Sequence, residues 1–84
     1  MEREKACLIC LRGNELLLGE CNIGDRFSVR LRIRCPEGSI PIGVWHTHPG
    51  GDSIPSSQDI KEARRVGLKF VCVEGSQGLK CFKV

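Results

Sequence analysis

The sequence lacks the features of a membrane protein or a secreted protein. No apolar run approaches the roughly 20 residues that a helix needs to cross a bilayer, and residues 1–5 contain no apolar core of a signal peptide. Long polar tracts of low complexity are also missing, and 40% of the residues are hydrophobic. We therefore expect a folded, cytoplasmic protein without a membrane partner. Its 84 residues predict a single small domain, 1–84.

Aromatic residues and net charge are also scarce. Tyrosine is absent, aromatic residues make up 5% of the chain, and the formal net charge is only +3. Binding to nucleic acid requires a strong basic surface, and binding to single strands adds aromatic rings among the basic residues. Neither pattern is present, so we expect no nucleic-acid partner.

Cysteine is abundant, with six residues, but the secretion signal that would favour a disulfide scaffold is missing. Cys7, Cys10, Cys72 and Cys81 lie in apolar runs, where a thiol behaves as a small hydrophobic group. The odd offset between Cys7 and Cys10 points them to opposite faces of a strand, which disfavours a shared metal. We expect free thiols, although the register of the last hairpin would place Cys72 opposite Cys81.

Hydrophobic periodicity predicts a mixed α and β domain. Apolar runs separated by turn residues predict strands at 6–11, 15–19 and 40–48, and a closing hairpin at 69–73 and 79–84. Between them, Ser56 or Ser57 caps a helix that runs to Val66 and stops at Gly67, with Ile60, Ala63 and Val66 on its buried side.

Residues 27–35 alternate strictly between apolar and polar side chains, which predicts a half-buried strand. Its polar face carries Arg30, Arg32 and Arg34. This row is either a docking surface for an acidic partner or, as we prefer, a solvated face that discourages aggregation.

The residues that indicate chemistry are two histidines and an aspartate. His46 and His48 lie two positions apart on a predicted strand and so share one face, and Asp59 lies at the start of the predicted helix. Two imidazoles and one carboxylate are typical of a catalytic zinc with a fourth position open to water. Zinc lowers the pKa of water to about 7 and polarises a carbonyl, while a nearby carboxylate accepts the proton. The alternative is ordinary strand histidines and a helix-capping aspartate.

The spacing of these residues resembles the JAMM, or MPN-plus, family of zinc peptidases. That family has the motif H-[S/T]-H-P, six residues, then S-x-x-D, and this chain reads His46-Thr47-His48-Pro49, residues 50–55, then Ser56-Ser57-Gln58-Asp59. The resemblance covers about Ile40 to Val84. It implies an α+β fold of the MPN/JAMM type, with a mixed or mostly antiparallel curved sheet. It also implies that His46, His48 and Asp59 bind zinc and that Ser56 holds the oxyanion or the water.

Two departures from the family pattern concern the N-terminal region. The family's general base is a glutamate at the head of the first core strand. Here it corresponds best to Glu4, with Glu2 and Glu15 as alternatives. Family members usually have a helix before that glutamate, which is missing here. A sheet face without that cover would be apolar, so we expect a homodimer or a stable partner to cover it.

By this resemblance the substrate is an amide or isopeptide bond at the C-terminus of a ubiquitin-like or sulfur-carrier protein. Such extended tails can add to the edge of a sheet. The competing interpretation is a protein-binding module of the same fold that is not catalytic. Family members of that kind usually lack the ligands, whereas this chain keeps all three.

Overall fold

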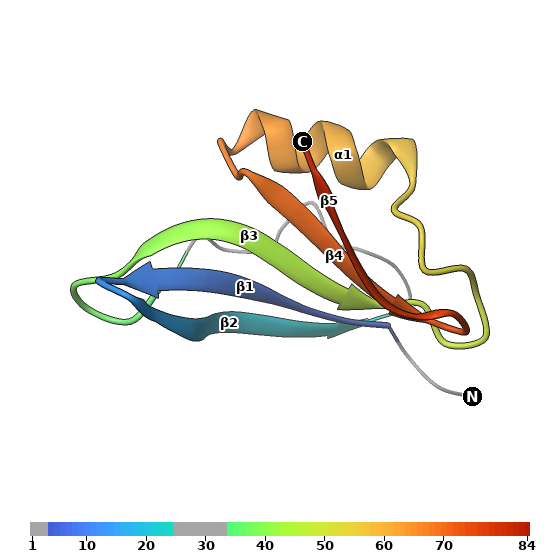
Figure 1. The fold of residues 1–84 in the computed structure, drawn as a ribbon, viewed down its shortest axis with the longest axis horizontal. Helices are drawn as coiled ribbons and strands as arrows, with labels where there is room; N and C mark the ends of the chain where they lie inside the picture. The colour runs from blue at the N-terminus through green and yellow to red at the C-terminus, as the bar shows by residue number, and fades with distance from the viewer. Residues whose placement is uncertain (1–3, 25–33) are drawn as a thin grey trace.

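The computed structural model describes residues 4–24 and 34–84. Within these residues, five strands form one sheet in the order β2-β1-β3-β4-β5, and one helix lies beside it (Figure 1). The elements in chain order are β1 (Glu4–Arg12), β2 (Glu15–Gly24), β3 (Ile40–Thr47), α1 (Ser57–Arg65), β4 (Phe70–Gly75) and β5 (Gly78–Lys83). In this part of the chain no helix is long and apolar enough to cross a membrane.

The sheet is mixed because one of its connections is a crossover. β1 pairs antiparallel with β2 and with β3, and β4 pairs antiparallel with β5, but β3 and β4 are parallel. Parallel neighbours need a long connection, and α1 provides it. The end of β3 and the start of α1 therefore lie at the same edge of the sheet. The mixed sheet and the helix confirm the predicted α+β class.

The helix begins and ends where the sequence predicts. Ser56 is the N-cap and forms a capping box with Asp59, while Val66 is the C-cap. Gly67 follows with a φ of 81°, a left-handed conformation that glycine adopts without the strain of a side chain. Ala63 is buried on the predicted inner side, and Ile60 and Val66 are half-buried.

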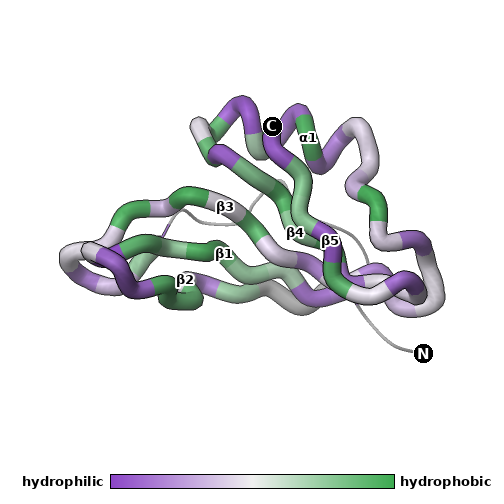
Figure 2. Tube along the Cα trace, viewed as in Figure 1, coloured by the Kyte–Doolittle hydropathy of each residue, from purple (hydrophilic) through white to green (hydrophobic). Residues whose placement is uncertain are grey.

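The core lies between α1 and the sheet. Leu8, Val44 and Val71 sit side by side on β1, β3 and β4, and all three are fully buried. Ala63 of α1 and Leu68 after it cover this row. Figure 2 shows the same concentration of hydrophobic residues along the central strands. The described residues contribute few buried core positions, as expected for so short a chain.

One strand prediction differs from the structure, and another lies mostly outside the described residues. β2 extends to Gly24, beyond the predicted 15–19, because a register shift between Cys7 and Ile9 lets β1 continue to pair with it. Most of the predicted strand at 27–35 lies outside the described residues, together with Arg30 and Arg32. Of that arginine row the structure describes Arg34, whose exposed guanidinium lies 3.8 Å from Glu20.

The expectation of free thiols is wrong. Among the described residues no cysteine is free, and the disulfides are Cys7–Cys21, Cys10–Cys35 and Cys72–Cys81. Two of them join residues that are direct neighbours on paired strands. The composition of residues 1–5, on which that expectation rests, carries no information about which cysteines the strand register brings together.

Reduction should strongly destabilise the fold. The disulfides close loops of 9, 14 and 25 residues, and each such loop stabilises the folded state by about 3 kcal/mol in the chain-entropy model. For a chain of this size we expect a reductant to lower the melting temperature by more than about 10 °C. Calorimetry with and without reductant measures this shift.

Thiol labelling of the unfolded protein provides the control. All six cysteines should label only after reduction, and labelling without reductant would contradict the pairing. The cytoplasmic localisation stays a prediction, since disulfides are rare in a reducing cytosol except in hyperthermophiles.

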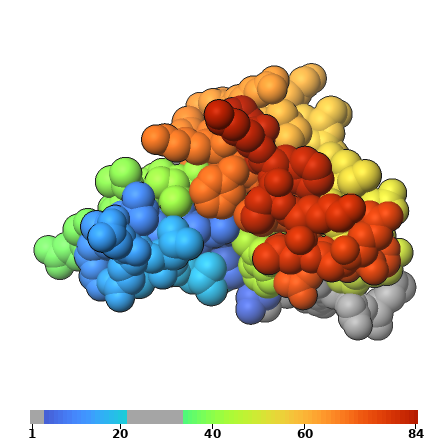
Figure 3. All heavy atoms as spheres, in the orientation of Figure 1, coloured from blue at the N-terminus to red at the C-terminus, as the bar shows by residue number. Residues whose placement is uncertain are grey.

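The sheet face opposite α1 is apolar and exposed. Leu16 is 65% exposed, Leu18 62% and Leu79 58%. With Ile9 and Trp45 they line a groove of about 380 Å³. We call these five residues the apolar face. In Figure 3 the orange atoms of β4 lie between the blue atoms of β1 and β2 and the red atoms of β5.

We propose that a second copy of the chain covers the apolar face. Strand spacing and rise give a five-stranded face of roughly 20 by 20 Å. Its projected area of about 400 Å² is about half of the roughly 800 Å² of accessible surface that each partner buries in a standard interface, so this face can supply a large part of one. Two-fold contacts between identical surfaces are the commonest kind in oligomers.

Sedimentation equilibrium tests this association. We expect the unaltered protein to be a dimer and Leu18→Glu to be a folded monomer, because the charge is harmless on an exposed position but costly in an apolar interface. The matched control, Lys61→Glu on the exposed side of α1, should stay dimeric. A monomer at every concentration would contradict the proposal.

Candidate metal centre

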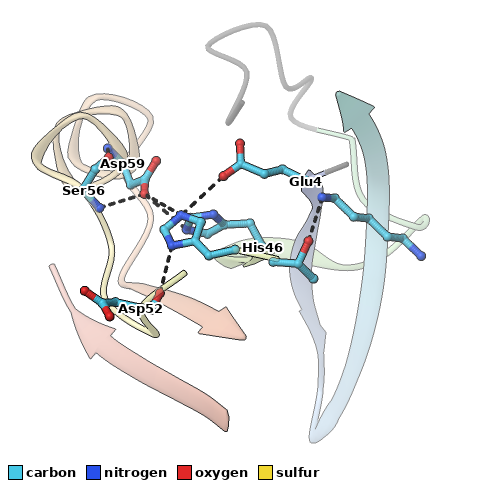
Figure 4. Close-up of polar contacts among 8 residues, drawn as sticks. Glu4, His46, Asp52, Ser56 and Asp59 are labelled. Atoms are coloured by element: carbon cyan, nitrogen blue, oxygen red, sulfur yellow. Dashed lines mark hydrogen bonds and ion pairs between the residues drawn. The ribbon is translucent and has the colours of Figure 1, made fainter. Parts of the chain in front are cut away.

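Three predicted ligands meet at the edge of the sheet where β3 ends and α1 begins. His46 is the second-last residue of β3 and is fully buried, while His48 follows the strand and keeps a side chain that is 20% exposed. Their rings lie nearly perpendicular, with centroids 4.7 Å apart. Asp59, in the first turn of α1, is only 2% exposed. Figure 4 shows the side chains of His46 and Asp59 turned toward one another.

The carboxylate of Asp59 faces both imidazoles. Its Oδ2 atom lies 3.4 Å from Nε2 of His46 and 4.0 Å from Nε2 of His48. The three ligand atoms all lie within 4.8 Å of one another. Ligands at 2.0–2.1 Å from a tetrahedral ion are about 3.3 Å apart, so a small contraction brings this group to the geometry of a metal site. His46, His48 and Asp59 thus form a group that could hold a metal ion.

Burial favours the form of His46 that binds metals. Removal from water lowers the pKa of His46 below the usual histidine value, because the low dielectric disfavours the charged ring. The carboxylate of Asp59 opposes this shift and the neighbouring His48 adds to it. The neutral ring, which has a nitrogen lone pair for a metal, is the favoured form.

Glu4 reaches the same site from the head of β1. Its Oε1 atom lies 3.6 Å from Nε2 of His48, and its side chain is 24% exposed. The N–H of the next residue, Lys5, donates to the hydroxyl of Thr47 at 2.9 Å and ties this strand end to β3. The alternative Glu15 lies at the other end of β1, where it pairs with Arg12 at 2.9 Å. Glu2 lies outside the described residues.

Ser56 lies next to the group as the N-cap of α1. Its hydroxyl accepts a hydrogen bond from the N–H of Asp59 at 3.2 Å, and its own N–H donates to Oδ2 of Asp59 at 2.9 Å. The first bond uses a lone pair of the hydroxyl, so the hydroxyl proton is not committed to it. The capping interpretation of Asp59 and its place among the histidines are therefore both correct.

A second layer of contacts was not anticipated from the sequence. Nδ1 of His48 lies 3.0 Å from the backbone carbonyl of Asp52. A carbonyl can only accept, so this contact places the proton on Nδ1 and the lone pair on Nε2, which faces Asp59. Ser53, the next residue, is fully buried. In the sequence it is an ordinary serine in a loop of glycine, proline and aspartate, and no local signal distinguishes it.

The group opens to solvent on the side of His48. A cavity of about 570 Å³ adjoins that residue and is lined by Lys5, Thr47, His48, Pro49, Gly50, Glu74, Gly75 and Ser76. His46 and Asp59 are not among these residues. An incoming molecule would thus meet the exposed edge of the group, beside His48, while the other two ligands stay enclosed.

Comparison with known proteins agrees with this architecture. The family model described as prokaryotic homologs of the JAB domain matches residues 11–83. The chain belongs to this family. In structure, the JAB domain is similar to the crystal structure of a JAB1/MPN domain protein from Archaeoglobus fulgidus, with a TM-score of 0.61 and 20% identity, over 95% of this chain and 69% of that one. No curated protein matches the sequence.

These matches confirm the expected family and its MPN-like fold. At 20% identity the structural likeness concerns the fold alone. The grouping of His46, His48 and Asp59 is observed in the structure of this chain and does not depend on the comparisons.

Metal analysis tests the group directly. We expect the JAB domain to contain about one metal ion per chain. The metal content should fall strongly in His48→Ala and in Asp59→Asn, because each substitution removes one of three ligands. Asparagine keeps the size of Asp59 and an oxygen that can serve the helix cap. Elemental analysis after dialysis measures the metal, and Glu15→Gln, at the far end of β1, is the control. Full metal content in both ligand variants would refute the site.

Proposed function

We propose that this JAB domain is a zinc-dependent hydrolase of amide or isopeptide bonds. The observation that carries the proposal is the convergence of two imidazoles and one carboxylate. Among the residues that the structure describes, this group contains three ligands and no fourth. Structural zinc sites have four protein ligands, whereas catalytic sites have three and keep one position open. Two histidines and one carboxylate, with one position left open, are a ligand set that catalytic zinc sites use.

The zinc ion would be held by His46, His48 and Asp59. When bound, zinc supplies an activated water and polarises the carbonyl that is attacked. The protein's own contribution begins with the burial of His46 and Asp59, which keeps competing water away from two of the three ligands. The electrostatic effect of the ion is stronger in such a dry site.

Glu4 is the proposed general base. Its carboxylate lies on the exposed side of the group, 3.6 Å from Nε2 of His48, where a water and a substrate would arrive. It can accept a proton from the water and later deliver it to the leaving amine. The Lys5 to Thr47 hydrogen bond holds the head of β1 close enough for this role.

Ser56 is proposed to stabilise the developing charge on the substrate. Its hydroxyl proton is not used in the bond from the N–H of Asp59, and α1 adds the positive end of its dipole at the same place. A hydroxyl and a helix N-terminus are both typical donors to an oxyanion.

The proposed substrate is the C-terminal tail of a ubiquitin-like or sulfur-carrier protein, as the family resemblance implies. The cavity beside His48 is open and shallow, with residues of β3 on one side and the β4–β5 turn on the other. An extended tail could lie in this open site beside His48. The alternative is a protein-binding module that is not catalytic.

Substitution of Glu4 distinguishes a hydrolase from a binding module that is not catalytic. Glu4→Gln keeps the size of the side chain but removes the base, so we expect zinc content to be retained and turnover to fall by about 10²–10⁴-fold. The assay is hydrolysis of a carrier protein extended at its C-terminus. The matched control is Glu15→Gln, which should have normal activity.

Treatment of the unaltered protein with a chelator tests whether its activity depends on zinc. Activity that disappears with chelator and returns with zinc supports the hydrolase. Loss of activity in Glu15→Gln but not in Glu4→Gln would overturn the assignment of the base. Zinc binding without turnover of any carrier would favour the binding module.

A further inference from the structure

The loop between the two halves of the metal site is fastened to the β4–β5 hairpin. The hydroxyl of Ser53 donates to the carbonyl of Gly78 at 2.6 Å and accepts from the N–H of Gln77 at 3.2 Å. The N–H of Ser76 donates to the carbonyl of Gly51 at 2.8 Å. These three bonds join residues 51–53 to the turn of a hairpin more than 20 positions later in the chain.

Gly75 lets the two segments approach closely enough for these bonds. A Cβ atom at this position would lie 2.6 Å from the carbonyl oxygen of Gly51 and 2.9 Å from that of Asp52. Both distances are far below an ordinary contact, and the atoms met are backbone, which cannot rotate away. A side chain at Gly75 would therefore push the loop off the hairpin.

The position of the loop matters for His48. The loop carries the carbonyl of Asp52, which accepts from Nδ1 of His48 at 3.0 Å (Figure 4). Groups that bind the second nitrogen of a metal-binding histidine fix its tautomer and ring orientation. Ser53 follows Asp52 directly and is fully buried, so its two hydrogen bonds set the place of that carbonyl.

We propose that Ser53 and Gly75 are positioning residues for the metal centre. They seat residues 51–53 on the hairpin, and the Asp52 carbonyl then holds the ring of His48 with Nε2 toward Asp59. The inference rests on the metal binding in the proposed function but adds residues outside the ligand motif. It makes the β4–β5 hairpin a structural part of the site.

The first test needs no metal and compares the unaltered protein with Ser53→Ala. In the metal-free protein, ¹⁵N nuclear magnetic resonance distinguishes the two tautomers of the neutral His48 ring. We expect the Nδ1–H form in the unaltered protein and a mixture of both forms in Ser53→Ala. A dominant Nε2–H form in the unaltered protein would overturn the proposal, whether or not the protein binds zinc.

The second test measures zinc affinity by competition with a chelator. We expect Ser53→Ala to weaken zinc binding by about tenfold or more, and Gly75→Ala to act in the same direction. The matched control is Ser39→Ala, which also removes a hydrogen bond from a serine hydroxyl to a carbonyl, that of Pro36. It lies at the opposite end of β3 and should bind zinc normally.

The melting temperature of the metal-free variants separates positioning from stability. If Ser53→Ala and Ser39→Ala lose similar stability but only Ser53→Ala loses affinity, the positioning role is supported. Equal affinities in the two variants would refute it. A failure of the unaltered protein to bind zinc would instead refute the proposed function and leave the tautomer result to decide the inference.

Discussion

The carboxylate of Asp59 accepts a hydrogen bond from the N–H of Ser56 and faces two imidazoles with the same oxygen atom. This contact belongs to the start of α1 and to the candidate metal centre at once. The capping box fixes the helix start and thereby aims the carboxylate before any ion arrives. A site whose ligands are held in place by the fold loses less conformational entropy on binding.

The rest of the architecture serves to bring the two ends of this contact together. The parallel pairing of β3 with β4 forces a crossover, and the crossover places the start of α1 beside the end of β3. His46 is carried by β3 into the core, in the same row of the sheet as Ala6 and Val73. The core is small, and three disulfides compensate for its size by restricting the unfolded chain.

Local patterns were enough to predict the strands around the core and the helix with its cap. They also singled out the three candidate ligands, which the family resemblance then assigned to a metal. His46, His48 and Asp59 could be found because the spacing of the motif implies one strand face and one helix start. The cysteine pairing could not be foreseen in full, since it depends on a register shift in β1 and on segments distant in sequence. The position of Cys72 opposite Cys81 followed from counting along a hairpin, but the redox state did not.

The sequence favoured Glu4 over Glu15 through the family resemblance alone, because both glutamates precede apolar runs. In the structure they stand at opposite ends of β1, and Glu4 is the one beside His48. Ser53 and Gly75 matter only through contacts between a loop and a hairpin that are remote in the chain. Such contacts arise from tertiary packing, which local periodicity does not describe.

Anomalous diffraction at the zinc absorption edge, from crystals grown without a chelator, is the most direct measurement on the candidate metal centre. The account predicts a peak about 2.0–2.2 Å from Nε2 of His46, Nε2 of His48 and Oδ2 of Asp59. A zinc peak at a different set of residues, or none in zinc-soaked crystals, would contradict it.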